Sequence, residues 1–279
     1  MLHSLRQIQD AASNVSKLRS FLARLKSSNR PGEPAVDADD VFLYPNGMYA
    51  VCSLSESLAG TDSTVAVWLY PETVNVLRRG SWGRCVSHKL GNEEELQCLE
   101  EALRSGQQIR ALFCELPSNI LLSSPDLHRL RELTDRNGFI VVCDDTVAGF
   151  VNLDALLLVD IMVSSMTKTF SGASLVTGEV SSSVPAPTTT TTKTLKTALA
   201  TYHSKSLINI GANFTLAIPY VQLANYWNRE KVPKYGVPGH IFRLSVGLED
   251  VDELVETAGR ALREVELLDG KTEQVVYQV

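Results

Sequence analysis

The chain has 279 residues, of which 44% are hydrophobic and 21% charged, a composition typical of one large globular domain or of one domain with a smaller second one. Its formal net charge of −6 argues against a nucleic-acid partner, because phosphate binding favours a basic surface. No apolar run is long enough for a membrane span. Five scattered cysteines without metal-ligand spacing, together with the lack of a secretory signal, predict a reduced cytoplasmic protein without a metal site.

The first 40 residues are expected to form a helix and a linker. Residues 15–26 place leucines and a phenylalanine on one helical face and basic side chains elsewhere. This pattern favours an ordinary amphipathic helix over a mitochondrial transit peptide, which can look the same. Residues 27–40 (SSNRPGEPAVDADD) are polar and carry proline and glycine, so they are interpreted as a linker.

From residue 65 onward, short apolar runs alternate with longer amphipathic segments. The short runs predict strands, and the amphipathic segments with capping signals predict helices. This β-α-β alternation predicts an α/β fold with a parallel sheet and right-handed crossovers. The expected strands are residues 65–69, 109–114, 139–143 and 161–163, and the expected helices are residues 93–104, with Asn92 as the N-cap, and a helix that starts at Ser124-Pro125-Asp126, with the proline at its first position, and ends at Asn137-Gly138.

Polar segments follow three of the expected strands, at residues 115–119 (ELPSN), 144–146 (DDT) and 164–168 (SSMTK). Ligands of a parallel sheet bind beyond the carboxyl ends of its strands, so these segments are candidates for one site. A lysine at the end of a buried strand, Lys168, is unusual, because burial of an unpaired ammonium group is costly.

Covalent capture of Lys168 by an aldehyde cofactor would remove this cost, and pyridoxal 5'-phosphate is such a cofactor. Its pyridine nitrogen needs a carboxylate, and Asp144 is placed at a strand end for that role. Its phosphate needs donors, which helix-terminal N–H groups and nearby hydroxyls can supply. A strand-end aspartate, a lone lysine or an Asn-Gly turn indicates little alone, but their order predicts a pyridoxal phosphate site. The phosphate donors would be Gly47, Met48, Ser165 and Thr167.

The alternation stops after Gly178. Residues 181–197 (SSSVPAPTTTTTKTLKT) are of low complexity, and no packed core is expected from them. Order is expected to return near Leu207, with a strand at 241–246, a helix at 251–263 and a loose tail. The predicted divisions are residues 1–40, the helix and linker; 41–180, an incomplete cofactor-binding large domain; 181–205, a low-complexity linker; and 206–279, the remnant of a small domain.

Five motifs resemble those of the Cys/Met-metabolism enzymes, the group of cystathionine γ-synthase, γ-lyase and β-lyase, and most resemble its fungal γ-synthase-like branch. The resemblance implies a pyridoxal-phosphate-dependent transferase fold of the aspartate-aminotransferase type (fold type I). This fold has a parallel-rich sheet with helices on both faces and a small C-terminal α+β part. The motifs are YPNGMYAV, FCELPSN, VVCDDTVAGFVN, SSMTKTFSG and FRLSVGLED.

The resemblance also implies a role for each matching residue. Lys168 would be the catalytic residue, holding the cofactor and later moving protons, and Asp144 would pair with the pyridine nitrogen. Asn119 would lie near the phenolic oxygen of the cofactor. The phosphate would be bound by Gly47, Met48, Ser165 and Thr167, and the substrate by Ser118 and by Arg243, whose guanidinium suits an α-carboxylate.

Two hypotheses of function follow. The first, which we favour, is an active transsulfuration-type enzyme that performs γ-replacement or elimination on a homoserine ester or cystathionine. The second is a truncated, non-catalytic paralogue or incomplete gene product, because family members carry a longer segment between the lysine and arginine motifs. Glu72 also stands where the family has a tyrosine that stacks on the cofactor. A nicotinamide-dependent dehydrogenase is disfavoured, since no G-x-G-x-x-G follows a strand.

The motifs leave the reaction and the assembly open. They do not distinguish a γ-synthase from a γ-lyase or a β-lyase, and they do not identify the thiol or ester. The expected partners are small amino-acid substrates, with no nucleic acid and no membrane. The family forms dimers and tetramers, so a homo-oligomer and a monomer are both alternatives for this shorter chain.

Overall fold

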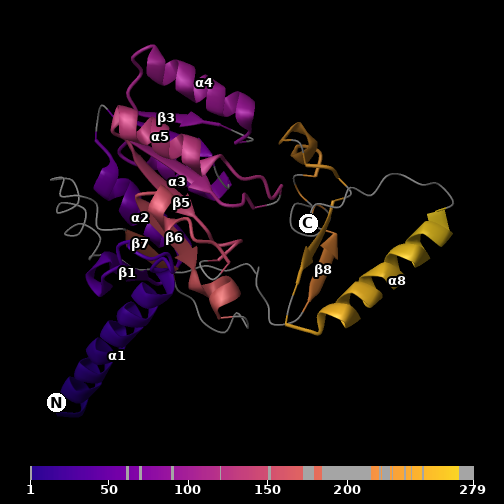
Figure 1. Ribbon diagram of the computed structural model, residues 1–279, viewed down its shortest axis with the longest axis horizontal. Coiled ribbons are helices and arrows are strands. Elements are labelled where there is room, and N and C mark those ends of the chain that lie inside the picture. The colour runs from indigo at the N-terminus through magenta and orange to yellow at the C-terminus, as the bar shows by residue number, and fades with distance from the viewer. Residues whose placement is uncertain are drawn as a thin grey trace.

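The computed structural model describes residues 2–60, 63–68, 71–88, 91–119, 121–149, 152–171, 179–183, 215–219, 221, 227, 229–235, 237–239, 241–246 and 248–269. In this part of the chain, strands form one seven-stranded and one two-stranded sheet, and helices cover both faces of the larger sheet (Figure 1). This arrangement confirms the predicted α/β class. None of the described helices is long and apolar enough to cross a membrane.

The larger sheet has the strand order β1-β7-β6-β5-β4-β2-β3. Strands β2 to β6 are parallel wherever they pair, whereas β7 runs antiparallel to both β1 and β6. The sheet is therefore parallel-rich, as predicted. Its strands are β1 (Val41–Tyr44), β2 (Thr64–Trp68), β3 (Arg84–Ser87), β4 (Ala111–Glu115), β5 (Ile140–Asp144), β6 (Ile161–Ser165) and β7 (Glu179–Ser183).

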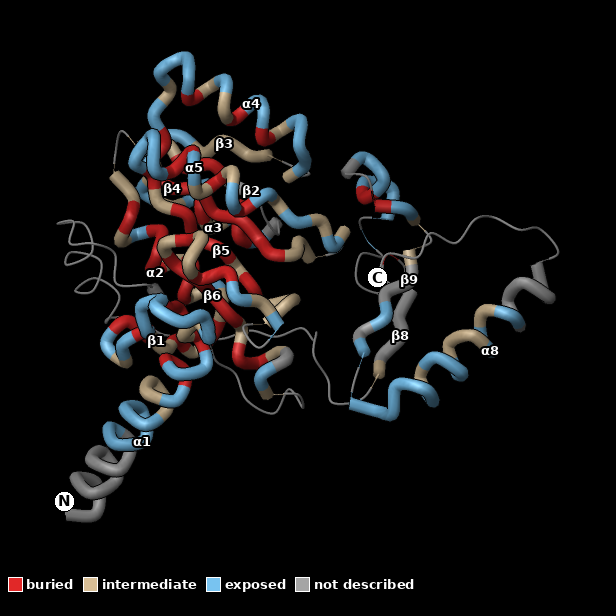
Figure 2. Tube along the Cα trace, in the orientation of Figure 1, coloured by how far each residue is buried: buried red, intermediate tan, exposed pale blue. Residues whose placement is uncertain are grey.

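Two hydrophobic cores lie on opposite faces of this sheet. Successive side chains of a strand point to opposite faces, so Val141 and Cys143 join one core and Val142 joins the other. Figure 2 shows the buried residues concentrated along the central strands. The first face is covered by α1 (Leu2–Lys26), α4 (Glu93–Arg104) and α5 (Leu127–Asn137), and the second by α2 (Gly47–Leu58) and α3 (Pro71–Arg79). Short 3-10 turns occur at Ala38–Asp40, Leu156–Leu158 and Val232–Tyr235.

Capping residues set the ends of α4 and α5. The predicted α4 is confirmed, and the Asn92 side chain accepts a hydrogen bond from the Glu95 N–H at 3.1 Å. The expected first position of α5 is wrong: Asp126 is the N-cap, so Pro125 precedes the cap and is not the first helical residue. Gly138 ends α5 with φ 73°, a left-handed conformation that glycine adopts without steric cost.

β7 corrects the interpretation of the serine-rich segment. Ser181 and Ser182, at the start of the predicted low-complexity linker, are buried, and Ser181 pairs with Phe42 of β1 and Val163 of β6. A serine run can form a central strand because ladder hydrogen bonds involve the backbone and not the side chain. The expected boundary at residue 180 thus falls inside a strand, although the division into domains stays a prediction. The remaining linker, the region near Leu207 and the tail lie outside the described residues.

The second sheet pairs β8 (Leu216–Pro219) antiparallel with β9 (Phe242–Ser245) and is followed by α8 (Val251–Asp269). Both the strand and the helix predicted here are confirmed. Asp250 caps α8 by accepting hydrogen bonds from the N–H groups of Asp252 at 3.0 Å and Glu253 at 3.2 Å. The Thr215 hydroxyl donates to the Glu249 carboxylate at 2.8 Å, which joins the start of β8 to the segment before α8.

Candidate functional site

The polar segments that follow β4, β5 and β6 meet at one edge of the sheet. β4, β5 and β6 are adjacent and parallel. Glu115, the last residue of β4, pairs with Asp144, the last residue of β5, and Asp144 pairs in turn with Val163 of β6. The expectation that these segments converge is therefore confirmed by the strand register.

Asp144 belongs to the face of the sheet that α2 and α3 cover. It lines a cavity of about 10 Å³ with Val51 of α2 and Thr73 of α3. Its carboxylate accepts a hydrogen bond from the Thr146 N–H at 2.9 Å. Burial raises the pKa of Asp144 to about 6, although the hydrogen bonds from Thr146 oppose the rise. A cationic group beside this carboxyl would stabilise its charged form.

Lys168 lies in a π-helical turn, Met166–Phe170, that directly follows β6. The lysine is half-buried and has a non-helical backbone with φ −86° and ψ −119°, while Thr167 is buried. The Ser165 N–H donates to the Thr146 hydroxyl at 2.9 Å. Thr146 therefore ties the segment of Asp144 to the segment of Lys168. Thr146 lies in one of the three segments predicted to form the site, but this contact between the two segments was not predicted.

The N-terminus of α2 offers donors on the same face. Asn46 caps the helix by accepting a hydrogen bond from the Tyr49 N–H at 3.0 Å, and Gly47 and Met48 form the first turn. The first N–H groups of a helix attract anions. Asn46 is 5% exposed, and its Nδ2 has no hydrogen-bond partner within the described residues. The two residues after Asn46 were predicted to bind the phosphate, but this buried donor was not, although an asparagine before a helix is a capping signal.

The other predicted residues are less closely tied to this edge. The Asn119 N–H donates to the Glu115 carboxylate at 2.6 Å, which folds the loop back onto the end of β4. The Ser118 and Ser123 hydroxyls share a hydrogen bond of 2.9 Å within that loop. Arg243 lies on β9 in the second sheet, opposite Ile218 of β8. The roles of Ser118, Asn119 and Arg243 stay predictions.

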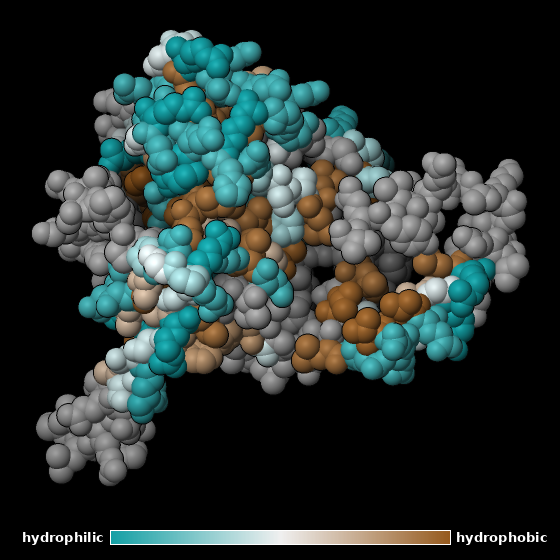
Figure 3. Space-filling view, viewed as in Figure 1, coloured by the Kyte–Doolittle hydropathy of each residue, from teal (hydrophilic) through white to brown (hydrophobic). Residues whose placement is uncertain are grey.

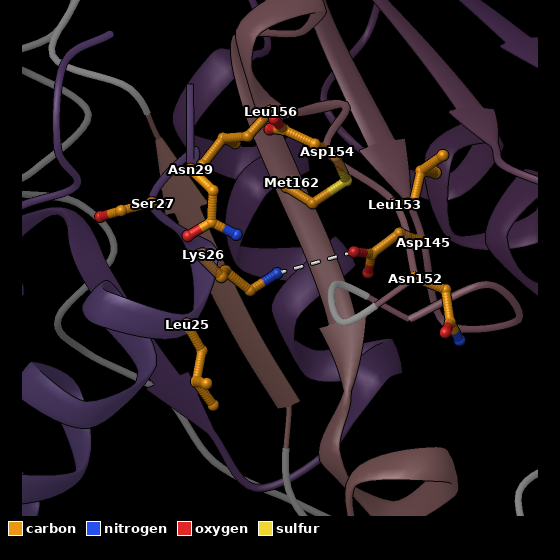
Figure 4. Close-up of a pocket in the computed structure, with 10 residues that line it drawn as sticks. All are labelled: Leu25, Lys26, Ser27, Asn29, Asp145, Asn152, Leu153, Asp154, Leu156 and Met162. Atoms are coloured by element: carbon orange, nitrogen blue, oxygen red, sulfur yellow. Dashed lines mark ion pairs between the residues drawn. The ribbon is translucent and has the colours of Figure 1, made fainter. Parts of the chain in front are cut away.

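A second polar cluster lies on the opposite face, where the C-terminal end of α1 meets β5 and β6 (Figure 4). Lys26 donates to the Ser164 hydroxyl at 2.5 Å and forms an ion pair of 3.8 Å with Asp145. Burial raises the pKa of Asp145, and the charge of Lys26 opposes that rise. A cavity of about 160 Å³ lies beside the pair, between α1 and the segment after β5. The partners of Lys26 were not predicted from the sequence, because nothing local to α1 indicates them.

Comparison with known proteins agrees with this geometry. Residues 35–204 match the Cys/Met metabolism PLP-dependent enzyme family. The chain is 31% identical to a cystathionine gamma-synthase-like protein of Aspergillus thermomutatus, with 93% of this chain and 62% of that protein covered. It is 28% identical to the cystathionine gamma-synthase of Neurospora crassa, with 88% of this chain and 55% of that protein covered. The chain therefore belongs to the Cys/Met metabolism PLP-dependent enzyme family.

Solved structures show the same fold. The cystathionine gamma synthase of Xanthomonas oryzae pv. oryzae in complex with aminoacrylate and cysteine superimposes with a TM-score of 0.70 at 15% identity, covering 91% of this chain and 86% of that chain. The predicted transferase fold is thereby confirmed. The chain spans only 55% to 62% of the length of the two fungal relatives described above.

Pyridoxal phosphate is the cofactor of this family, and the donors at the strand ends suit it. A lysine is available for the aldehyde, and the half-buried carboxyl of Asp144, whose pKa is raised, is available for the ring nitrogen. The start of α2 is available for the phosphate, with the buried Nδ2 of Asn46 as an additional donor. The residues present therefore fit the cofactor chemically.

Proposed function

We propose that this protein is a pyridoxal-phosphate-dependent enzyme of the transsulfuration type. Its reaction is γ-replacement or elimination on a homoserine ester or on cystathionine. The observation that carries the proposal is the joining of the Asp144 and Lys168 segments, on adjacent strand ends, through Thr146. Similarity to fungal proteins named for cystathionine γ-synthase supports this choice of reaction.

Each residue has a definite task in this proposal. When bound, pyridoxal phosphate supplies an electron sink that acidifies the α-carbon of an amino acid. Lys168 holds the aldehyde of the cofactor and moves protons at that α-carbon, and Asp144 keeps a proton on the ring nitrogen. Asn119 would lie near the phenolic oxygen of the bound cofactor. The phosphate is held by Gly47, Met48, Ser165 and Thr167, and the substrate is held by Ser118 and by Arg243, which binds the α-carboxylate.

The proposed setting follows from the substrate class. Family members act on small amino acids, and we infer a cytoplasmic enzyme that forms a homo-oligomer as its family does. Light scattering on the purified chain tests the assembly, because a monomer at all concentrations would contradict it. The choice between synthase and lyase is tested by the products formed with and without an added thiol.

The direct test supplies the 279-residue protein with pyridoxal phosphate, O-acylhomoserine and cysteine, and follows cystathionine by mass spectrometry. We expect cystathionine to form with the natural protein and not with Lys168→Ala. Arg243→Ala should raise the KM for the amino acid while leaving cofactor binding unchanged. Cofactor binding through Lys168 without turnover of either a homoserine ester or cystathionine would contradict the proposed activity and leave a non-catalytic protein with a retained cofactor site.

A further inference from the structure

Lys26 is a buried cation with no place in the proposed chemistry. Its side chain is 2% exposed and that of Asp145 is 1% exposed. Such an ion pair costs desolvation energy that its Coulomb attraction seldom exceeds by much. Ser164 completes the cluster, since it accepts from Lys26 and donates to the Asp145 carboxylate. The three side chains form a closed network between α1 and two strand ends, and Figure 4 shows the ion pair of Lys26 and Asp145 within it.

This network is close in sequence to two of the predicted cofactor contacts, Asp144 and Lys168. Asp145 follows Asp144, and Ser164 lies four residues before Lys168. Because side chains alternate along a strand, the network is on the α1 face while Asp144 is on the α2 face. The Asp145 N–H also donates to the Val163 carbonyl at 3.0 Å. Any displacement of Asp145 or Ser164 would therefore move the backbone that carries the cofactor residues.

A second contact joins α1 to the π-helical turn that contains Lys168. The rings of Phe21 and Phe170 meet edge to face with their centroids 6.5 Å apart, and Phe170 lies two residues after Lys168. Phe21 is on α1, five residues before Lys26. The same helix thus contacts the chain both before and after the lysine. One contact is polar and the other is between aromatic rings, and they involve different residues. Each is therefore independent evidence that α1 supports the turn that contains Lys168.

We propose that Lys26 is a positioning residue, which holds the strand ends that carry Asp144 and Lys168 through its contacts with Ser164 and Asp145. The inference rests on the proposed function, in which these two residues bind pyridoxal phosphate. Lys26 does not touch the cofactor, and α1 is a structural part of the cofactor site. The site still binds pyridoxal phosphate. Lys26 determines how well Asp144 and Lys168 are positioned before the cofactor binds.

The test is a titration of full-length variants with pyridoxal phosphate, followed by the visible absorbance of lysine-bound cofactor. Lys26→Met should weaken cofactor affinity on the order of tenfold and shift the absorbance band. Lys17→Met is the matched control, because it makes the same change at an exposed position of the same helix, and it should bind as the natural protein does. Ser164→Ala keeps both charges and removes the shared hydroxyl, so a smaller loss of affinity is expected.

A double variant separates positioning from simple stability. Lys26→Met combined with Asp145→Asn leaves no unpaired buried charge, so the unfolding midpoint of the cofactor-free protein should recover. Under the proposal its cofactor affinity stays low, because the tie to α1 is still missing. Natural affinity in the double variant and in Ser164→Ala would overturn the inference, whether or not Lys26→Met alone folds.

The same titration distinguishes failure of the proposed function from failure of the inference about Lys26. If the natural protein gives no absorbance band that depends on Lys168, the proposed function fails and the inference falls with it. If that band forms normally in the natural protein and in every Lys26 and Ser164 variant, only the inference fails. Reduced affinity in Lys26→Met and the double variant, with Lys17→Met unchanged, supports the inference and the cofactor site on which the proposed function depends.

Discussion

The seven-stranded sheet and the C-terminal β8-β9-α8 region differ in the exposure of their apolar side chains. In the sheet, Phe113 of β4 is 2% exposed and packs in the core beneath α2 and α3. In the C-terminal region, Leu248 is 86% exposed and Val255 is 67% exposed. Figure 3 shows hydrophobic side chains gathered on the surface around β9 and the start of α8, where Leu244, Val246 and Val251 are exposed.

The two regions differ in how firmly packing holds the backbone that carries each motif. The cofactor motifs lie at strand ends whose strands are buried on both faces, so packing holds their backbone in place. The motif with Arg243 lies on a two-stranded sheet, and two strands alone are marginally stable in water. We therefore expect cofactor binding to withstand changes that impair substrate binding.

The largest expected effect concerns the two apolar positions themselves. Phe113→Ala should lower the free energy of unfolding by about 3–5 kcal/mol, because it leaves a cavity in the core. Leu248→Ala should change it by less than about 0.5 kcal/mol, because the side chain is already in water. Urea denaturation monitored by circular dichroism measures both. Equal losses at the two positions would refute the contrast between the regions.

A smaller effect is expected at Asp144, a half-buried carboxyl at the end of β5. Its pKa of about 6 in the folded protein lies above the ordinary value of 3.8, so the folded state binds the proton more tightly. The stability that this provides is present below pH 3.8 and is lost as the pH rises through about 6.

Asp144→Asn should therefore stabilise the cofactor-free protein above pH 6 by up to about 3 kcal/mol, while weakening cofactor binding. Unfolding curves of the variant and the natural protein at pH 4 and pH 8 measure the difference. At the lower pH the two proteins should be closer in stability. A constant difference across this range would show that the charge of Asp144 is not buried at a cost.

The smallest effect on stability is expected at Gly138, where the backbone conformation favours glycine. Gly138 ends α5 with φ 73°, a conformation that disfavours any side chain, so Gly138→Ala should cost about 1 kcal/mol. Gly239 has open space around it and no left-handed φ, which makes Gly239→Ala the control. Thermal unfolding should show a lower midpoint for the first variant alone. A similar shift in both would mean that the local conformation at Gly138 is not what matters.

Local patterns predicted the elements that local physics determines. Asn92 and Gly138 marked helix ends, because capping depends on one or two residues. The meeting of the segments after β4, β5 and β6 was predictable, because parallel strands present their carboxyl ends at one edge. β7 was missed because strand pairing satisfied a serine-rich run that carries no hydrophobic alternation. The network of Lys26 was missed because both of its partners are distant in sequence.

The most direct test of the central claim is to identify the lysine that holds the cofactor. The 279-residue protein is incubated with pyridoxal phosphate and reduced with borohydride, and its peptides are mapped by mass spectrometry. The account predicts one dominant modified site, Lys168, and no such modification of the peptide that contains Lys26. Modification spread over exposed lysines, or its absence from Lys168, would contradict the claim that the strand-end motifs form a cofactor site in this chain.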